Sequence, residues 1–271
     1  MDRDQRHDDE HPWNQELPEL QDGWDMDEES EGKRRRPAWL LRLAAAIALV
    51  AFIALSYAWL PLIAPSHFEF LRQDRELSGE AVVKASKPAV VSITATIPDG
   101  IPGSTRGGTG FNIASEGLVV TNRHVVDGAA SIMITFSDYR RFYSKQYQII
   151  EKYDLAVIRI KGQGLPVLPL SYTLPAIDEE VTVIGNPLGY QRVSARGPVE
   201  GYYDGGEAGA AVFAIRAIAE PGSSGSPVID RQGRVCGVVY AITSIRKDGK
   251  EIRYSLAIPA DALKALSISG S

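Results

Sequence analysis

The feature that most constrains this chain is a series of short runs, rich in β-branched residues, that begins near residue 89 and continues almost to the end. Gly, Pro, Asn and Asp separate the runs, a pattern typical of antiparallel strands that curl into barrels. The runs lie at 89–97, 109–126, 131–136, 147–160, 181–185, 211–219, 226–242 and 252–258. Only two helices are expected beside them, at 79–86 and 259–266, the second because proline suits the first turn of a helix. We therefore expect an all-β region of about 200 residues.

An acidic N-terminal tail precedes this region. Residues 1–36 contain thirteen acidic and six basic side chains with Pro, Gln and Trp between them, a composition typical of disorder. Trp13 and Trp24 leave two interpretations open, an unstructured linker or short motifs that dock to a cytoplasmic partner. Residues 65–271 contain 22 basic and 21 acidic residues, so the formal net charge of -5 belongs to the tail. No nucleic-acid-binding surface is expected.

Residues 37–64 are expected to form a transmembrane signal anchor. The 22 residues from Leu43 to Ala64 carry no charge, and a helix of that length, at ~1.5 Å per residue, crosses a hydrocarbon core of ~30 Å. A buried core helix fits poorly with a run that is apolar all round. A cleaved signal peptide is the other alternative, although its preceding region would be long and acidic.

Charge on either side of this segment predicts its orientation. Basic residues at 33–36 and at 42 flank its N-terminal side, and such residues favour the cytoplasm. We expect a single-pass inner (plasma) membrane protein with a cytoplasmic N-terminus. A stem at 65–77 would lead to a domain in the periplasm or another extracytoplasmic space.

A serine among glycines is the strongest chemical motif of the chain. Ser224 lies in the segment PGSSGSP at 221–227. Glycine permits the tight backbone path that exposes a nucleophile, and the amides of Gly222 and Ser224 could donate to the oxyanion of a tetrahedral intermediate. A segment of this composition is also compatible with an ordinary flexible loop.

His124 and Asp154 are the candidate partners of Ser224. A serine hydroxyl needs a general base, and His124 is the only histidine between residues 68 and 271. A carboxylate must then orient the imidazole, and Asp154 lies at the start of an otherwise apolar strand. Taken singly, a structural histidine and an aspartate that bonds its local backbone remain alternatives.

Three segments in this order resemble the trypsin-like serine proteases, in particular the HtrA/Deg group. They are TNRHVV at 121–126, DLAVIRI at 154–160 and PGSSGSPV at 221–228, and further similar segments are GGTGF at 107–111, IGNPLG at 184–189, GPVEG at 197–201 and SLAIP at 255–259. The likeness extends from about residue 78 to 268.

The resemblance implies a protease domain at 78–271. It would consist of two six-stranded antiparallel β-barrels, at about 80–172 and 173–258, and a C-terminal helix at 259–268. The active site would lie between the barrels, without a cofactor. The resemblance also suggests a trimer.

The same analogy assigns a substrate pocket. Its floor would be Ile218, six residues before Ser224, and its wall would be Val239, Tyr240 and Ala241. An apolar floor offers no partner to a buried Lys or Arg side chain. Cleavage after small or aliphatic residues is therefore expected.

The chain also departs from the families that it resembles. It ends at residue 271, directly after the expected terminal helix, so we expect no PDZ domain. Ser223 stands where digestive trypsins have aspartate, which disfavours activation by propeptide removal, and Ser226 stands where HtrA/Deg proteins usually have glycine. Cys236 is the single cysteine, so no internal disulfide is expected, and no cysteine and histidine spacing suggests a zinc site.

These observations predict a membrane-tethered extracytoplasmic serine endopeptidase that cleaves unfolded or regulatory proteins. Ser224 would attack, His124 would transfer the proton, Asp154 would orient His124, and the amides of Gly222 and Ser224 would form the oxyanion hole. One alternative is a catalytically silent binding module with a protease fold, anchored in the membrane. An esterase is a third reading, because the same groups serve esters.

Overall fold

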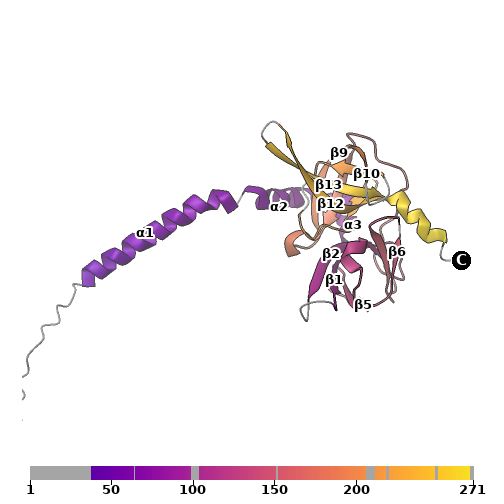
Figure 1. Cartoon of the computed structure of the whole chain (residues 1–271), viewed down its shortest axis with the longest axis horizontal. Helices are drawn as coiled ribbons and strands as arrows, with labels where there is room; N and C mark the ends of the chain where they lie inside the picture. Colours follow the sequence, from indigo (N-terminus) through magenta and orange to yellow (C-terminus); the bar gives the residue numbers. More distant parts are fainter. Residues whose placement is uncertain are drawn as a thin grey trace, which may run out of the picture. The chain divides into compact units, whose positions relative to one another are not determined.

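The structure is a computed structural model that describes residues 38–63, 65–98, 104–150, 152–205, 211–217, 220–247 and 250–268 (Figure 1). The chain divides into two compact units, Met1–Ala58 and Trp59–Ser271. The helices are α1 Ala38–Ile63, α2 Pro65–Leu77, α3 Ala81–Ser86 and α4 Arg123–Val126, with 3₁₀ segments η1 Lys87–Ala89, η2 Pro187–Gly189 and η4 Ala260–Ile268. The strands are β1 Val90–Thr96, β2 Thr105–Asn112, β3 Leu118–Thr121, β4 Ser131–Thr135, β5 Arg141–Ser144, β6 Tyr147–Ile150, β7 Leu155–Arg159, β8 Glu180–Gly185, β9 Val193–Asp204, β10 Ala211–Ile215, β11 Pro227–Ile229, β12 Val235–Lys247 and β13 Lys250–Pro259.

The first seven strands form one antiparallel sheet in the order β5-β4-β1-β2-β3-β7-β6. Residues in β4 alternate between buried and half-buried, as expected for a strand with one face toward a core. The sheet curves around buried apolar side chains that include Val91, Ile93 and Ile158. It forms a half-barrel.

This half-barrel corrects the expectation of a six-stranded barrel at 80–172. The segment from 141 to 150 forms two short strands, β5 and β6, which are the opposite edges of the sheet. Ser144 turns the chain between them: its hydroxyl donates to Arg159 O at 2.8 Å and accepts from Gln146 N at 3.0 Å. The β-branched pattern of the sequence did not reveal β5, because its residues are mainly polar or aromatic.

The second group of strands forms a closed six-stranded barrel in the order β10-β13-β12-β11-β8-β9, as expected. β9 was not among the runs recognised in the sequence, because glycine and proline interrupt it. A Cβ atom added to Gly197 would lie 2.1 Å from Arg216 O. This glycine therefore marks a close approach of two backbones rather than the end of a strand.

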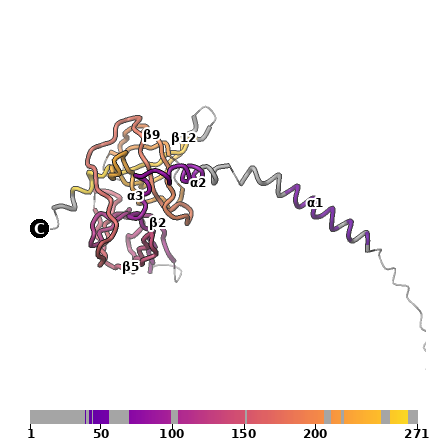
Figure 2. Tube along the Cα trace, turned by 180° about the vertical axis from the view of Figure 1, so that it is seen from behind, coloured from indigo at the N-terminus to yellow at the C-terminus, as the bar shows by residue number. Residues whose placement is uncertain are grey.

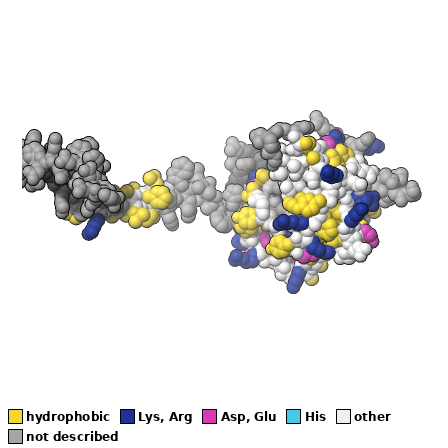
Figure 3. All heavy atoms as spheres, turned by 90° about the horizontal axis from the view of Figure 1, so that it is seen from below, with side chains coloured by type: hydrophobic (Ala, Val, Ile, Leu, Met, Phe, Trp, Pro, Cys, Tyr) yellow, Lys and Arg dark blue, Asp and Glu magenta, His cyan; other side chains and the backbone are white. Residues whose placement is uncertain are grey.

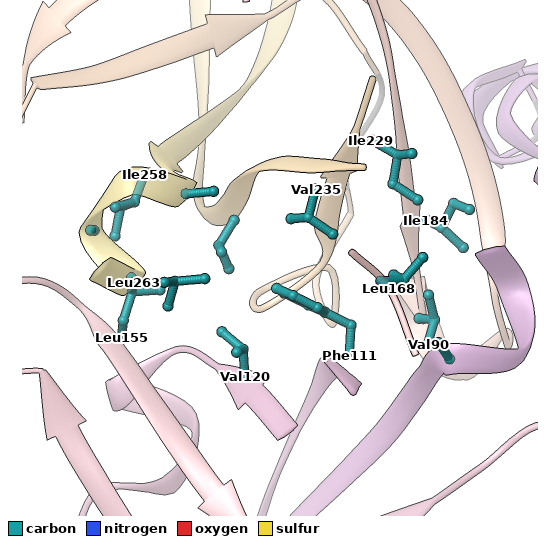
Figure 4. Close-up of a cluster of buried hydrophobic side chains, with 14 of the residues drawn as sticks. Val90, Phe111, Val120, Leu155, Leu168, Ile184, Ile229, Val235, Ile258 and Leu263 are labelled. Carbon is teal, nitrogen blue, oxygen red and sulfur yellow. The ribbon is translucent and has the colours of Figure 1, made fainter. Parts of the chain in front are cut away.

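A shared apolar core joins the half-barrel to the barrel. Figure 4 shows Val120 and Leu155 from the half-barrel facing Val235, Ile258 and Leu263 from the second group. Each of these side chains is at most 1% exposed. Burial of apolar surface contributes ~25 cal/mol per Å², so this cluster stabilises the relative position of the two groups of strands.

The helices differ from the expectation in two places. Residues 65–77, expected only as a stem, form helix α2. Figure 2 shows the domain from behind, with α3 following α2 along the chain. Pro259 does not start the C-terminal helix: it is the last residue of β13, paired with Gly237, and η4 begins at Ala260 as a 3₁₀ helix. The extended backbone that pairing requires overrides the preference of proline for a first helical turn.

Basic side chains are dispersed over one face of the surface, and the N-terminal helix exposes apolar side chains. On the face shown in Figure 3, Lys and Arg side chains are spread among apolar and uncharged ones rather than gathered in one patch. Large apolar side chains of α1, such as Ile47, Val50 and Phe52, are more than half exposed. Judged on the described residues alone, none of the helices has the length and apolarity needed to cross a membrane. The tail at 1–36 lies outside the described residues.

Candidate active site

His124 lies in a short helix directly after a strand. Buried β3 leads through Asn122 into α4, and Val125 and Val126 anchor this helix in the half-barrel core. The imidazole itself points outward, with 49% of its side-chain surface exposed. The fold thus presents the ring to solvent from a rigid support.

Asp154 lies directly against His124. Tyr153 N donates to Ile150 O, and Asp154 lies immediately before β7. One carboxylate oxygen lies 2.6 Å from His124 Nδ1, and the other accepts the His124 backbone amide at 3.0 Å. Asn122 Nδ2 also donates to the Asp154 carbonyl at 2.8 Å. Since an ionised carboxylate only accepts, this geometry places a proton on Nδ1 and leaves Nε2 as the acceptor of a neutral ring.

The segment around Ser224 is a tight loop with two glycines in the left-handed region. Gly222 has φ of 98° and Gly225 has φ of 85°, values at which a side chain would be strained. Bonds from Ser223 N to Glu220 O and from Gly225 N to Val239 O hold the loop. The observed path is therefore a defined turn and not a flexible linker.

The two amides named as oxyanion donors are free of protein acceptors within the described ranges. Leu188 N donates to Pro221 O at 2.8 Å. Because C=O and N–H point in opposite directions across a trans peptide bond, this bond turns the Gly222 N–H away from Leu188. The hydrogen bond from Leu188 N to Pro221 O thus sets the orientation of the Gly222 amide.

Thr109 joins the half-barrel to this loop. Its amide donates to Ser224 O at 2.8 Å, and its hydroxyl donates to Gly222 O at 2.7 Å. The same hydroxyl accepts from Asn186 N at 2.9 Å, and Thr121 Oγ1 donates to Thr109 O at 2.7 Å. One residue of β2 therefore fixes both Gly222 and Ser224.

Gly108 separates Ser224 from the helix that carries His124. A Cβ atom added to Gly108 would lie 2.8 Å from Val125 Cγ1 and 3.4 Å from Ser224 O. Only glycine fits between these neighbours. The described part of the chain contains no hydrogen bond between the Ser224 hydroxyl and the His124 ring, so the direct contact is that of His124 with Asp154.

The four expected pocket residues lie in different surroundings. Val239 is fully buried in the core of the second barrel, whereas Tyr240 lines a cavity of about 430 Å³ with side chains of β9, β10 and β13. Ala241 follows after a β-bulge and is half-buried. Ile218 lies outside the described residues.

Two ionisable groups near the loop are shifted toward their neutral forms. Burial raises the pKa of the Tyr240 phenol, and the Asp154 carboxylate adds to the shift. Burial, followed by the charge of Asp230, raises the pKa of the Cys236 thiol to about 12. A thiol with that pKa is almost entirely protonated at neutral pH and is a poor nucleophile.

Two serines and one ion pair complete the loop environment. Ser226 is fully buried, and its hydroxyl has no hydrogen-bond partner within the described residues. Ser223 Oγ accepts from Glu220 N at 3.3 Å. Glu220 is 4% exposed and pairs with Arg253 of β13, so the acid nearest to Ser224 in sequence already has a cation. The described residues contain no cluster of three His, Cys, Asp or Glu side chains that could hold a metal ion.

The sequence motifs did not single out Thr109, Asn122, Asn186 or Leu188. Thr109 lies in GGTGF, and Asn186 and Leu188 lie in IGNPLG. These segments resemble those of the HtrA/Deg group but carry no direct chemical signal, because the partners of these residues are distant in sequence. A threonine beside a glycine pair, as in GGTG at 107–110, was the available signal.

Comparison with known proteins finds a trypsin-like peptidase domain and relatives that are serine proteases. Residues 108–238 match the model of the trypsin-like peptidase domain. The chain is 36% identical over 169 residues to the putative serine protease HhoA of Synechocystis sp., covering 59% of this chain and 41% of that protein. It is 34% identical over 164 residues to a probable periplasmic serine endoprotease DegP-like of Hahella chejuensis, covering 57% of this chain and 33% of that protein. The chain thus spans less than half the length of these relatives.

Solved structures support the same fold. The active form of the Rv3671c protease from M. tuberculosis aligns with a TM-score of 0.60 and 25% identity, over 72% of this chain and 86% of that one. The HtrA-type protease AlgW with a tripeptide aligns with a TM-score of 0.58 and 25% identity, over 69% and 61%. The half-barrel and closed barrel are therefore those of an all-β trypsin-like fold.

Replacement of Thr109 tests the junction between the half-barrel and the loop. Thr109→Val removes the hydroxyl and leaves Gly222 O and Asn186 N without their partner, and a buried unsatisfied polar group costs about 1–3 kcal/mol. We expect a loss of about 2–4 kcal/mol in the free energy of unfolding, measured by urea denaturation. Thr109→Ser keeps the hydroxyl and is expected to lose about 1 kcal/mol. Equal stability of the two variants would contradict the role of the hydroxyl.

Proposed function

We propose that this chain, whose trypsin-like serine protease domain is of the HtrA/DegP type, is an extracytoplasmic serine endopeptidase that cleaves unfolded or regulatory proteins. The single observation that supports this most is the 2.6 Å contact of His124 Nδ1 with Asp154 beside the loop that carries Ser224. A carboxylate in that position fixes the tautomer that a general base requires.

The proposed reaction is acyl transfer to Ser224. The Ser224 hydroxyl oxygen attacks the peptide carbonyl while His124 Nε2 takes the hydroxyl proton. His124 then returns this proton to the leaving amine as the C–N bond breaks. Water hydrolyses the resulting ester with His124 again as the base, which releases the carboxylic acid and restores Ser224.

The oxyanion of each tetrahedral intermediate would bind the amides of Gly222 and Ser224. Oriented donors stabilise the charge that develops in the transition state and need no reorganisation during the reaction. The bond from Leu188 N to Pro221 O and the bonds of Thr109 support this role, because they fix the backbone that carries both amides. No cofactor takes part.

The substrate side chain before the cut would enter a pocket formed by Ile218, Tyr240 and Ala241, with Val239 behind them in the barrel core. The neutral phenol of Tyr240 and the aliphatic character of the other three residues favour small or aliphatic side chains. Glu220 is paired with Arg253 and so offers no free charge to a substrate cation.

We also propose that residues 37–64 tether the protein to the membrane, with the tail at 1–36 in the cytoplasm. The uncharged sequence from Leu43 to Ala64 and the exposed apolar side chains of α1 support this tether. The name of the Hahella chejuensis relative, a probable periplasmic endoprotease, supports a location of the protease domain outside the cytoplasm. Trimer formation is proposed from the resemblance to the HtrA/Deg group, and a cytoplasmic partner of the tail is proposed from the sequence at 1–36.

Ser224→Ala tests the nucleophile. Removal of the serine of a Ser-His-Asp triad lowers kcat by about 10⁶-fold, so casein hydrolysis should disappear while the fold is kept. A fluorophosphonate probe should label the wild type and a Ser244→Ala control, which changes an exposed serine of β12, but not Ser224→Ala. Comparable hydrolysis by Ser224→Ala would refute the assignment, and an unlabelled wild type would favour the binding module.

Peptide substrates test the pocket. A series that differs only in the residue before the cut should show kcat/KM at least about 10-fold higher for Ala, Val or Leu than for Lys or Arg, because an unpaired cation is costly to bury. Ile218→Asp should narrow or reverse this preference by supplying a counter-charge. Faster cleavage after Lys or Arg by the wild type would show that the pocket is wrongly assigned.

Cell fractionation tests the tether. The full chain should stay in the membrane pellet after an alkaline carbonate wash, and externally added protease should degrade the domain in spheroplasts while sparing the tail. Lysine at the centre of a spanning helix costs about 3 kcal/mol, so a Leu49→Lys, Phe52→Lys variant should be partly released. Quantitative release of the wild type by the wash would exclude a spanning anchor.

A further inference from the structure

Helix α2 is fixed to a turn of the second barrel. The Phe70 side chain is 2% exposed, and its ring lies edge-on to that of Tyr190, with centroids 5.8 Å apart and planes at 71°. Aromatic rings favour this arrangement. Asp74 Oδ1 accepts from Ser194 N at 2.7 Å and from Lys87 Nζ at 2.8 Å. The helix therefore contacts both the turn at 186–192 and the start of β9.

The turn at 186–192 has a strained backbone. Leu188 has φ of 51° and Arg192 has φ of 54°, and such values persist only where surrounding contacts impose them. Asn186 Oδ1 accepts from Arg192 N at 2.9 Å, and Pro187 O accepts from Tyr190 N at 2.8 Å. Phe70 packs on the outside of this turn, at Tyr190.

The other end of the same turn contacts the loop that carries the proposed oxyanion donors. Leu188 N donates to Pro221 O at 2.8 Å. A Cβ atom added to Gly222 would lie 2.6 Å from Asn186 O, so the two backbones are in close contact. Any shift of Leu188 would therefore change the direction of the peptide bond between Pro221 and Gly222.

We infer that α2 is a positioning element for the oxyanion hole, and that Phe70 and Tyr190 are its positioning residues. The contact between these rings holds the strained turn, and the turn holds Pro221 O, which orients the Gly222 N–H. This inference rests on the proposed function, because it names what sets the geometry of that site. It also gives the segment that follows α1 a role in catalysis beyond that of a spacer.

The arrangement predicts a specific kinetic effect. Loss of the ring contact would loosen the turn without touching the substrate, His124 or Asp154. The oxyanion donor acts on the transition state, so its misplacement lowers kcat and leaves KM nearly unchanged. A helix that only stabilises the fold would lower the melting temperature and leave kcat of the folded protein as it is.

The test compares Phe70→Ala and Tyr190→Ala with the wild type, all as the full chain in detergent. Complete removal of one oxyanion donor costs about 10²–10³ in kcat, and for a displaced donor we expect a loss of about 10-fold to 100-fold, with KM within about twofold. A peptide aldehyde, whose adduct places an oxyanion in the hole, should bind more weakly by a similar factor. Affinity for a non-reactive peptide of the same sequence should stay constant.

Two further variants separate positioning from stability. Tyr190→Phe keeps the ring, and since Tyr190 is 50% exposed, loss of its hydroxyl should leave kcat at the wild-type value. Arg75→Ala changes an exposed side chain of α2 and should also be neutral. Because Tyr190 is half exposed, Tyr190→Ala is expected to fold even if Phe70→Ala does not.

Hydrogen exchange provides a readout that does not depend on activity. The amides of Ser223 and Gly225, which donate to Glu220 O and Val239 O, should exchange about 10-fold faster in Tyr190→Ala than in Tyr190→Phe, because the turn no longer holds the loop. Wild-type kcat and unchanged exchange in Tyr190→Ala would overturn the inference, whatever its melting temperature. If the wild type itself neither hydrolyses peptides nor reacts with the probe, the proposed function fails, and the exchange data still decide whether α2 is coupled to the loop.

Discussion

The close contact of Thr109 with the loop at 221–227 is the constraint on which the rest of the site depends. The half-barrel provides His124 and Asp154, and the closed barrel provides Ser224. Neither group of strands therefore carries all three residues of the proposed site. The apolar core in Figure 4 brings the two together, but apolar packing is not directional. The hydrogen bonds from Thr109 to Ser224 O and Gly222 O fix the orientation of the loop relative to the half-barrel.

Much of the fold could be predicted from the sequence, because burial leaves a local pattern. Strands such as β1, β4 and β8 are visible as runs of β-branched residues between turn residues. β5 and β9 were missed because their residues are polar, aromatic or interrupted by glycine and proline, and because pairing with neighbours makes them strands. The opening of the first barrel was not predictable either, since it depends on which strands pair, and β5 and β6 lie at opposite edges of the sheet.

Part of the chemistry of the site could be predicted from local sequence motifs. A lone histidine, an acid before an apolar strand and a serine among glycines each leave a structural alternative open, and it is their joint occurrence in the order His, Asp, Ser that indicates one site. The contact of His124 with Asp154 agrees with that reading, and their roles in catalysis stay predictions. Thr109 and Leu188 could not be found this way, because their side chain or amide acts on residues that are distant in sequence. Only the folded chain brings them together.

The buried hydroxyl of Ser226 has a consequence for how this sequence can change. A Cβ atom at Gly185 would lie 2.2 Å from Ser226 Oγ. The Ser226 hydroxyl therefore occupies the space that the missing side chain of Gly185 leaves next to β8. Strand β8 and the loop before β11 thus share one volume at these two positions. A side chain at position 185 therefore requires a smaller residue at 226. Because Gly185 cannot become smaller, no change at 185 makes room for a residue larger than serine at 226.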